Sequence, residues 1–250
     1  MSPGAIALLA LAAFAAGLVD AIAGGGGLIT FPALVAAGLP PHLALGTNKG
    51  QAVFGAVSSA THFWRARGLD RNRVPLGFAL GFVGSLLGAL ALLALRPEPL
   101  RPVIIVLLAV AAAVVVLRGH VKPRPRTPAH PRLTLAAIAL VLGAYDGFFG
   151  PGVGSMLIVA FMMAFGDAIT RASGNAKIVN LASNLAAVAV FTWRGTILWS
   201  VAVPMAVTNA LGASLGAKLA ISRGDRFVRW VVLAVVAAAM IKLGADFVSR

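Results

Sequence analysis

The feature that most constrains this chain is the recurrence of apolar runs long enough to cross a lipid bilayer. Eight such runs follow one another from end to end, each close to the roughly 20 residues that a spanning helix needs. Only 11% of the 250 residues are charged, against roughly a quarter in a soluble domain. We therefore predict an all-α polytopic membrane protein. The predicted spans are 5–23, 43–64, 75–95, 101–117, 133–149, 172–193, 197–220 and 228–248.

Two shorter apolar stretches each follow a break made of glycine and proline. Residues 28–38 come after Gly24 to Gly27, and residues 153–165 come after Gly150 to Gly152. Because glycine and proline interrupt helices, each stretch is predicted to be a half-helix that continues from a broken one. Transporters built from repeats use such discontinuous helices at their binding sites.

The two halves of the chain repeat one another. Asp20 aligns with Asp146 at an offset of 126 residues, and Lys49 aligns with Lys177 at an offset of 128. An internal match of this length indicates two homologous helical repeats. The predicted organisation is a first transmembrane repeat at 1–120, a basic Pro-rich linker at 121–132 and a second transmembrane repeat at 133–250.

The net charge of +14 comes largely from Lys and Arg that lie between the spans, above all in 65–73 and 118–132. The positive-inside rule explains such loop charges without a nucleic-acid partner. If the two short stretches add membrane crossings, 13 basic residues fall on the side of these loops and four on the other. If they do not, the split is 11 to six. The first count favours inverted repeats, with the basic loops on the cytoplasmic side of the inner membrane.

Polar residues on one face of a predicted span indicate a binding site. Lys177, Asn180 and Asn184 have the spacing i, i+3 and i+7, and a lysine within a span is costly enough to suggest function. Ammonium and amide groups can donate hydrogen bonds to an oxyanion, although a polar clamp between helices is the alternative. The candidate anion-binding residues are Thr47, Asn48, Lys49, Gln51, Asn175, Lys177, Asn180 and Asn184, with backbone at Gly25, Gly26 and Gly152.

Asp20 and Asp146 each come four residues before a glycine break. One interpretation is that they carry a coupling proton, because burial favours a neutral carboxyl group. The other is a structural ion pair with Lys49 or Lys177. The sequence alone leaves both open.

Several other functions are not supported. Cysteine is absent, and no two histidines have ligand spacing on one helix face, so neither a metal nor a cofactor is expected. Gly24 to Gly27 is not followed by the Lys-Ser or Lys-Thr of a phosphate loop. An intramembrane enzyme would need Ser155 to meet Lys177, and we do not expect one. Glycines in other spans, such as Gly84 and Gly212, are predicted to form helix-packing faces.

Four stretches of sequence carry a resemblance to a known family. They are AGLVDAIAGGGGLITFPAL at 16–34, ALGTNK at 44–49, YDGFFGPGVGS at 145–155 and NAKIVN at 175–180. In these stretches the chain resembles the sulfite exporter TauE/SafE family of membrane transporters. The resemblance implies a secondary transporter that exports a small anion such as sulfite or an organosulfonate. A passive anion channel is the alternative. A small anion and the lipid bilayer are the expected partners, and a homodimer is a candidate assembly.

Overall fold

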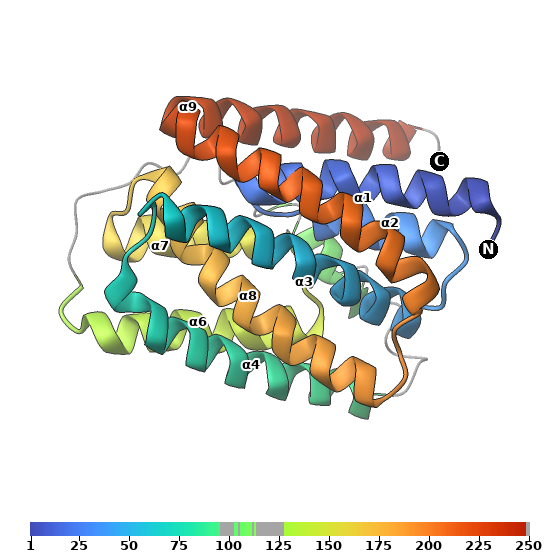
Figure 1. The fold of residues 1–250 in the computed structure, drawn as a ribbon, viewed down its shortest axis with the longest axis horizontal. Coiled ribbons are helices and arrows are strands. Elements are labelled where there is room, and N and C mark those ends of the chain that lie inside the picture. Colours follow the sequence, from blue (N-terminus) through green and yellow to red (C-terminus); the bar gives the residue numbers. More distant parts are fainter. Residues whose placement is uncertain (96–102, 105, 112, 114–127, 249–250) are drawn as a thin grey trace.

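The structure, a computed structural model, describes residues 1–95, 103–104, 106–111, 113 and 128–248, and within them it contains helices and no strand. Residues 101–102, 105, 112 and 114–117 of the predicted span 101–117, and residues 121–127 of the predicted linker, lie outside the described residues. The helices are α1 (Pro3–Ala23), α2 (Gly27–Ala36), α3 (Pro41–Arg65), η1 (Arg71–Arg73), α4 (Val74–Ala94), α6 (Pro131–Phe148), α7 (Val153–Phe165), α8 (Ile169–Trp193) and α9 (Trp199–Val248). They form a helical bundle in which the short helices α2 and α7 lie toward opposite sides (Figure 1).

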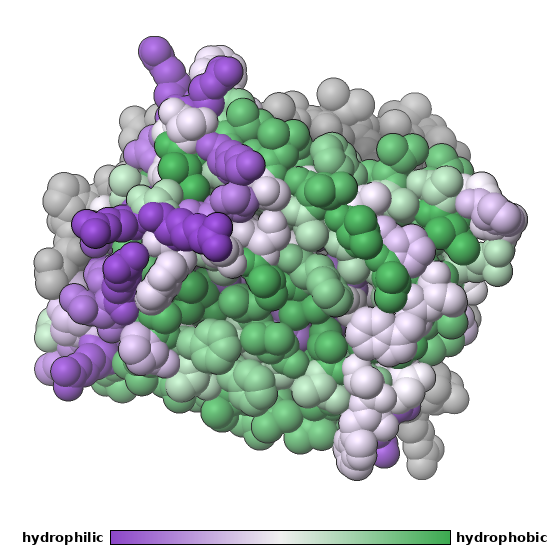
Figure 2. Space-filling model, in the orientation of Figure 1, coloured by the Kyte–Doolittle hydropathy of each residue, from purple (hydrophilic) through white to green (hydrophobic). Residues whose placement is uncertain are grey.

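The helices confirm a multi-pass membrane protein in general terms. Among the described residues, four helical segments are long and apolar enough to cross a bilayer: Pro3–Ala23, Arg71–Ala94, Ile169–Trp193 and Trp199–Val228. Much of the visible face is apolar, with the hydrophilic side chains gathered mainly toward one end (Figure 2). A lipid environment fits this distribution, since exposed apolar surface on this scale is unusual for a soluble monomer. The count of eight spans stays a prediction.

The short helix α2 turns back along α1 instead of crossing the bundle. It starts beside the interior part of α1, because a Cβ added at Gly26 would lie 2.6 Å from the carbonyl oxygen of Ala16. Farther along α2, Phe31 and Leu34 pack in the same apolar cluster as Leu9 near the start of α1. A helix of 10 residues reaches only about 15 Å at the helical rise. The chain therefore returns toward the end of the bundle where it began.

The helix α7 behaves in the same way in the second half of the chain. It begins against the first glycine break, where a Cβ at Gly154 would lie 2.9 Å from the Cα of Gly24. It ends near η1, where the guanidinium of Arg73 lies 4.0 Å from the ring centre of Phe165. Both half-helices thus start in the middle of the bundle, and they run to opposite ends.

Glycines let the long helices pack closely. A Cβ at Gly84 of α4 would lie 2.2 Å from the carbonyl oxygen of Leu140 in α6, and one at Gly212 of α9 would lie 2.1 Å from that of Phe14 in α1. Small residues of this kind allow helix backbones to approach in lipid. The predicted packing role of these two glycines is confirmed. Each contact joins a helix of one predicted half to a helix of the other.

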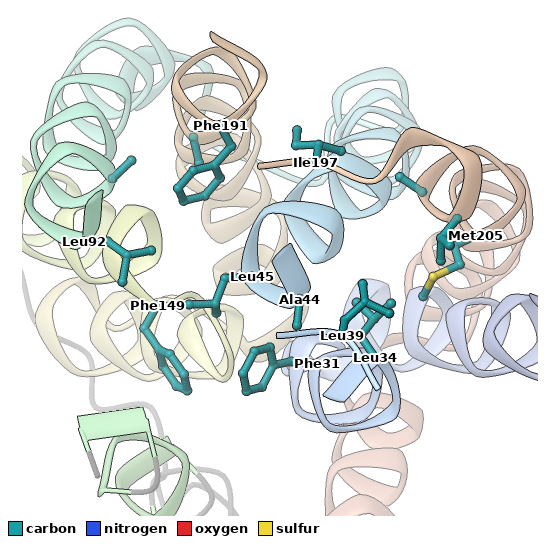
Figure 3. Close-up of a cluster of buried hydrophobic side chains, with 14 of the residues drawn as sticks. Phe31, Leu34, Leu39, Ala44, Leu45, Leu92, Phe149, Phe191, Ile197 and Met205 are labelled. Carbon is teal, nitrogen blue, oxygen red and sulfur yellow. The ribbon is translucent and has the colours of Figure 1, made fainter. Parts of the chain in front are cut away.

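A cluster of large apolar side chains fills the space beside the two breaks (Figure 3). Phe31 of α2 meets Phe149, which follows α6, with their ring centres 5.8 Å apart and their planes at 73°. This edge-to-face arrangement is favourable for aromatic rings. Figure 3 shows Leu45 of α3 and Leu92 of α4 in the same cluster. The regions around both breaks are therefore fixed to the same core.

Basic loops meet at one end of the bundle, on the left in Figure 1. Arg73 Nη1 lies 2.7 Å from Asp167 Oδ2, which joins η1 to the loop before α8. Thr170 Oγ1 donates to Asp225 Oδ1 at 2.6 Å, next to the kink that α9 makes at Gly224. Much of the hydrophilic surface visible in Figure 2 lies at this end. They are among the loops that the count of 13 basic residues against four places on the same side of the membrane.

Candidate functional site

The two glycine breaks touch each other, backbone against backbone, at the centre of the bundle. A Cβ at Gly24 would lie 2.4 Å from both the carbonyl carbon of Gly154 and the amide nitrogen of Ser155. Gly24 also has a φ of +73° and Gly152 a φ of +86°, which only glycine adopts without strain. The N-termini of α2 and α7 therefore lie in the same region. The first N–H groups of a helix have no acceptor within the helix, so they are available to other groups.

Asp146 is held by three side chains. Its Oδ1 accepts a hydrogen bond from Lys49 Nζ of α3, while its Oδ2 accepts from Asn180 Nδ2 at 3.3 Å and from Ser183 Oγ, both on α8. The side chains of Lys49 and Asp146 are only 4% and 2% exposed. A buried ion pair is tolerated when further hydrogen bonds satisfy the charged atoms. Both oxygens of Asp146 have such partners.

Asp20 forms the corresponding pair with the other lysine. Lys177 Nζ of α8 donates to Asp20 Oδ2 at 2.6 Å and to the backbone carbonyl of Asp20 at 2.5 Å. Asp20 Oδ1 accepts from the backbone N–H of Gly26 at 3.2 Å. The Lys177 side chain is 1% exposed, but that of Asp20 is 28% exposed. Both ion pairs thus join the first predicted repeat to the second.

A cluster of uncharged polar side chains lies between α2 and α3. Thr30 Oγ1 donates to Asn48 Oδ1 at 2.5 Å, and Gln51 Nε2 donates to the same oxygen at 3.1 Å. Gln51 Oε1 is the one buried side-chain nitrogen or oxygen in the described part of the chain that has no hydrogen-bond partner. An unsatisfied buried polar atom costs about 1–3 kcal/mol. This oxygen is therefore well placed to contact water or a ligand.

These groups surround a cavity of about 40 Å³. It has room for roughly three water-sized groups, since one water needs about 10–15 Å³ on this measure. A four-atom oxyanion such as sulfite is of similar size. Ten of the candidate residues chosen from the sequence line the cavity: Asp20, Gly25, Gly26, Asn48, Lys49, Gln51, Asp146, Gly152, Asn180 and Asn184.

Three candidate residues lie outside this lining, and each is engaged elsewhere. Thr47 Oγ1 accepts from the backbone N–H of Leu198 at 3.0 Å, which joins α3 to the segment before α9. Asn175 Nδ2 donates to Asp167 Oδ2 at 2.8 Å, close to the basic end of the bundle. Lys177 is fully buried and contacts the carboxylate that faces the cavity rather than the cavity itself.

Asn209 of α9 also lines the cavity and is not among the site residues predicted from the sequence. Its Nδ2 donates to the carbonyl oxygen of Ala13 at 3.1 Å. Its Oδ1 occupies the space beside Gly55, where a Cβ would lie only 1.8 Å away. An amide within an apolar span is itself a signal of a buried polar contact, and Asn209 could have been found in this way. Ser183, the partner of Asp146, lies beside Asn180 on the polar stripe and was also missed.

The charges around the cavity cancel. Lys49 and Lys177 are matched by Asp146 and Asp20, so the site combines zero net charge with many hydrogen-bonding groups. An intramembrane enzyme would need Ser155 to meet Lys177. Ser155 Oγ donates to a backbone carbonyl at the end of α1, at 3.1 Å, and Lys177 Nζ donates to Asp20. The arrangement suits the binding of a small polar ion.

The sequence of this chain is similar to those of known membrane transporters. The profile of the family described as "Sulfite exporter TauE/SafE" matches residues 9–243. A probable membrane transporter protein, YfcA, of Escherichia coli strain K12 is 36% identical over 247 residues, covering 98% of this chain and 92% of that protein. A probable membrane transporter protein of Haemophilus influenzae is 37% identical, and the match covers 91% of this chain and 90% of that protein. One of a Sinorhizobium species is 38% identical, and the match covers 96% of this chain and 93% of that protein. No solved structure gives a significant match.

Proposed function

We propose that this chain, which belongs to the sulfite exporter TauE/SafE family of membrane transporters, is a secondary transporter that exports a small oxyanion across the bacterial inner membrane. Sulfite or a small organosulfonate is the proposed cargo. The chain offers no nucleotide-binding motif, so the energy would come from ion or substrate gradients. The curated relatives are named only as probable membrane transporters, and the choice of cargo therefore rests on the site.

The observation that carries the proposal is the polar cavity at the contact between the two glycine breaks. Lys49 supplies a cationic donor there, and the amides of Asn180 and Asn184 supply further donors. The N-termini of α2 and α7 add partial positive charge, which favours anions. The volume of about 40 Å³ suits sulfite, whereas a larger sulfonate would require the surrounding helices to open.

We also propose that the two halves are inverted repeats that exchange access to this cavity between the two sides of the membrane. In support, α1 packs on α9 as α6 packs on α4, and α3 and α8 pack on each other. The half-helices α2 and α7 run from the centre to opposite ends. Both buried ion pairs link one half to the other. Transporters of this architecture bind substrate at the repeat interface. The basic end would face the cytoplasm.

Counterflow in proteoliposomes tests the proposal. Vesicles preloaded with sulfite should take up labelled sulfite faster than vesicles without it, because a transporter exchanges faster than it returns empty. Labelled uptake that is indifferent to preloading, but still blocked by site variants, would indicate a channel instead.

Two variants test whether the cavity is the binding site. Lys49→Met removes a charge-assisted hydrogen bond worth about 1.5–3 kcal/mol, which predicts a roughly tenfold to hundredfold loss of sulfite affinity. Because Lys49→Met also breaks a buried ion pair, Gln51→Met serves as the milder change, since it keeps the side-chain volume. Lys218→Met is the matched control, because Lys218 is an exposed lysine of α9. Unchanged sulfite affinity in both cavity variants would refute the assignment.

A further inference from the structure

The two aspartates that sequence symmetry makes equivalent are not equivalent in the structure. Asp146 has a side-chain donor on each oxygen and is 2% exposed. Asp20 has one side-chain donor, Lys177, and the backbone N–H groups of Gly26 and Gly25, and its side chain is 28% exposed. Both line the cavity. Asp20 is therefore the carboxylate that can change its partner or its protonation state.

The sequence explains this difference. The offset of 128 residues places Ala52 at the position that corresponds to Asn180, and Gly55 at the position that corresponds to Ser183. The two uncharged side chains of α8 that donate to Asp146 thus have no polar counterpart at the matching positions of α3. The space beside Gly55 is taken by Asn209 Oδ1, and Asn209 donates to the backbone of α1. The asymmetry is thus built into α3 and α8.

The two lysines also differ in their access to the cavity. Lys49 lines the cavity directly, whereas Lys177 does not and contacts Asp20 instead. An anion in the cavity therefore meets one cation, Lys49, whose charge is already balanced by Asp146. It also meets the negative charge of Asp20. With Asp20 ionised, a bound anion leaves one negative charge uncompensated in a buried site, which is strongly unfavourable.

One proton removes this excess charge. We infer that Asp20 takes up a proton when a singly charged anion such as hydrogensulfite enters, so that anion and proton are bound and released together, while Asp146 stays ionised as the fixed partner of Lys49. The proton binds a carboxylate oxygen of Asp20, and the charge of Lys177 then balances the anion. The inference rests on the proposed function, because it assumes that the cavity holds the anion.

The other charged groups near Asp20 are consistent with this assignment. Lys177 contacts it from α8, and Lys49 and Asp146 lie across the same cavity on α3 and α6. Among the described residues of the cavity lining, α2 and α7 contribute glycine backbone and Val153, while α9 contributes only the uncharged Asn209. No other described ionisable side chain lines the cavity. The proton therefore has two candidate sites, and Asp146 is the more buried of the two, with side-chain donors on both oxygens.

The test compares how sulfite affinity depends on pH in the purified full-length protein and in Asp20→Asn. Sulfite titrates in solution, but this contribution is the same for both proteins, so the difference in slope belongs to the protein. At pH values where Asp20 is ionised in the empty protein, each rise of one pH unit should lower the sulfite affinity of the natural protein by an extra factor of ten compared with Asp20→Asn. Linkage requires this difference when binding takes up one extra proton. Asp146→Glu, which keeps the negative charge beside Lys49, should keep the slope of the natural protein.

A second readout does not depend on whether Asp146→Glu folds. Adding sulfite to the natural protein should produce the infrared band of a protonated carboxyl group, and this band should be absent in Asp20→Asn. Parallel affinity slopes, with no such band, would overturn the inference but leave the proposed function intact. A slope that persists in Asp20→Asn would overturn the assignment to Asp20. Absence of sulfite binding in the natural protein would overturn both the proposed function and the inference.

Discussion

The buried pair of Lys49 and Asp146 allows a stability prediction with a defined magnitude. In Lys49→Met, the 2% exposed carboxylate of Asp146 keeps only Asn180 and Ser183 as donors. In Asp146→Asn, the 4% exposed ammonium loses its anion. Leaving one buried charge without its partner costs about 3–5 kcal/mol. We expect each single change to lower the free energy of unfolding by about that amount.

The double variant distinguishes an ion pair from two independent contacts. With Lys49→Met and Asp146→Asn together, no uncompensated charge remains, so the loss should not exceed that of either single change. Melting temperature in detergent is a practical measure, since 1 kcal/mol corresponds to roughly 2–4 °C for a chain of this length. The single variants should therefore melt about 6–20 °C lower. Lys218→Met, which removes an exposed lysine, should melt like the natural protein. Losses that simply add in the double variant would refute the reasoning.

Three further predictions concern other parts of the structure. Gly24→Ala should prevent accumulation of folded protein, measured as monodisperse protein after purification, because its Cβ would lie 2.4 Å from backbone atoms; Gly4→Ala, which has open space around it, should not. Cysteines introduced at the exposed positions Asn72 and Arg226 should react with an impermeant maleimide from the same side of the membrane, and reaction from opposite sides would contradict the arrangement of the basic end. Asp167→Asn breaks the ion pair of Asp167 with Arg73. If opening of the basic end limits exchange, this variant should change the rate of sulfite exchange more than the affinity for sulfite. Equal rate and affinity in the variant and the natural protein would exclude a role of this ion pair in opening.

The sequence predicted most of the helices because their signals are local. The helical run predicted at 43–64 is α3 at Pro41–Arg65, and that predicted at 153–165 is α7 at Val153–Phe165. Long apolar runs and glycine breaks are enough to define such elements. The two helical runs predicted at 197–220 and 228–248 also fit the structure, because α9 is divided into two helical parts at Gly224, whose φ of 65° and ψ of −163° are not helical.

The pairing of charges could not be predicted, because it depends on contacts between distant parts of the chain. Repeat symmetry allows Asp20 to pair with the lysine of its own half or of the other half, and only the packing of α1 against α8 selects Lys177. The same holds for the contact of Gly24 with Gly154, since each glycine suggests a break but not its neighbour. The polar stripe on α8 was visible in the sequence, whereas the unequal environments of the two aspartates required their neighbours in space.

The exchange of partners between the halves also affects how the protein is made. Helix α1 packs mainly on α9, and its Asp20 pairs with Lys177 of α8. Because synthesis proceeds from the N-terminus, α1 enters the membrane long before either partner exists. Asp20 lies three residues before the end of α1, so it bears only part of the roughly 2.5–3.5 kcal/mol that an aspartate costs at the centre of a spanning helix during insertion. The first helix must therefore wait in the bilayer, or beside the insertion machinery, with its carboxyl group unpaired. Biogenesis of this protein is complete only when the last helices arrive.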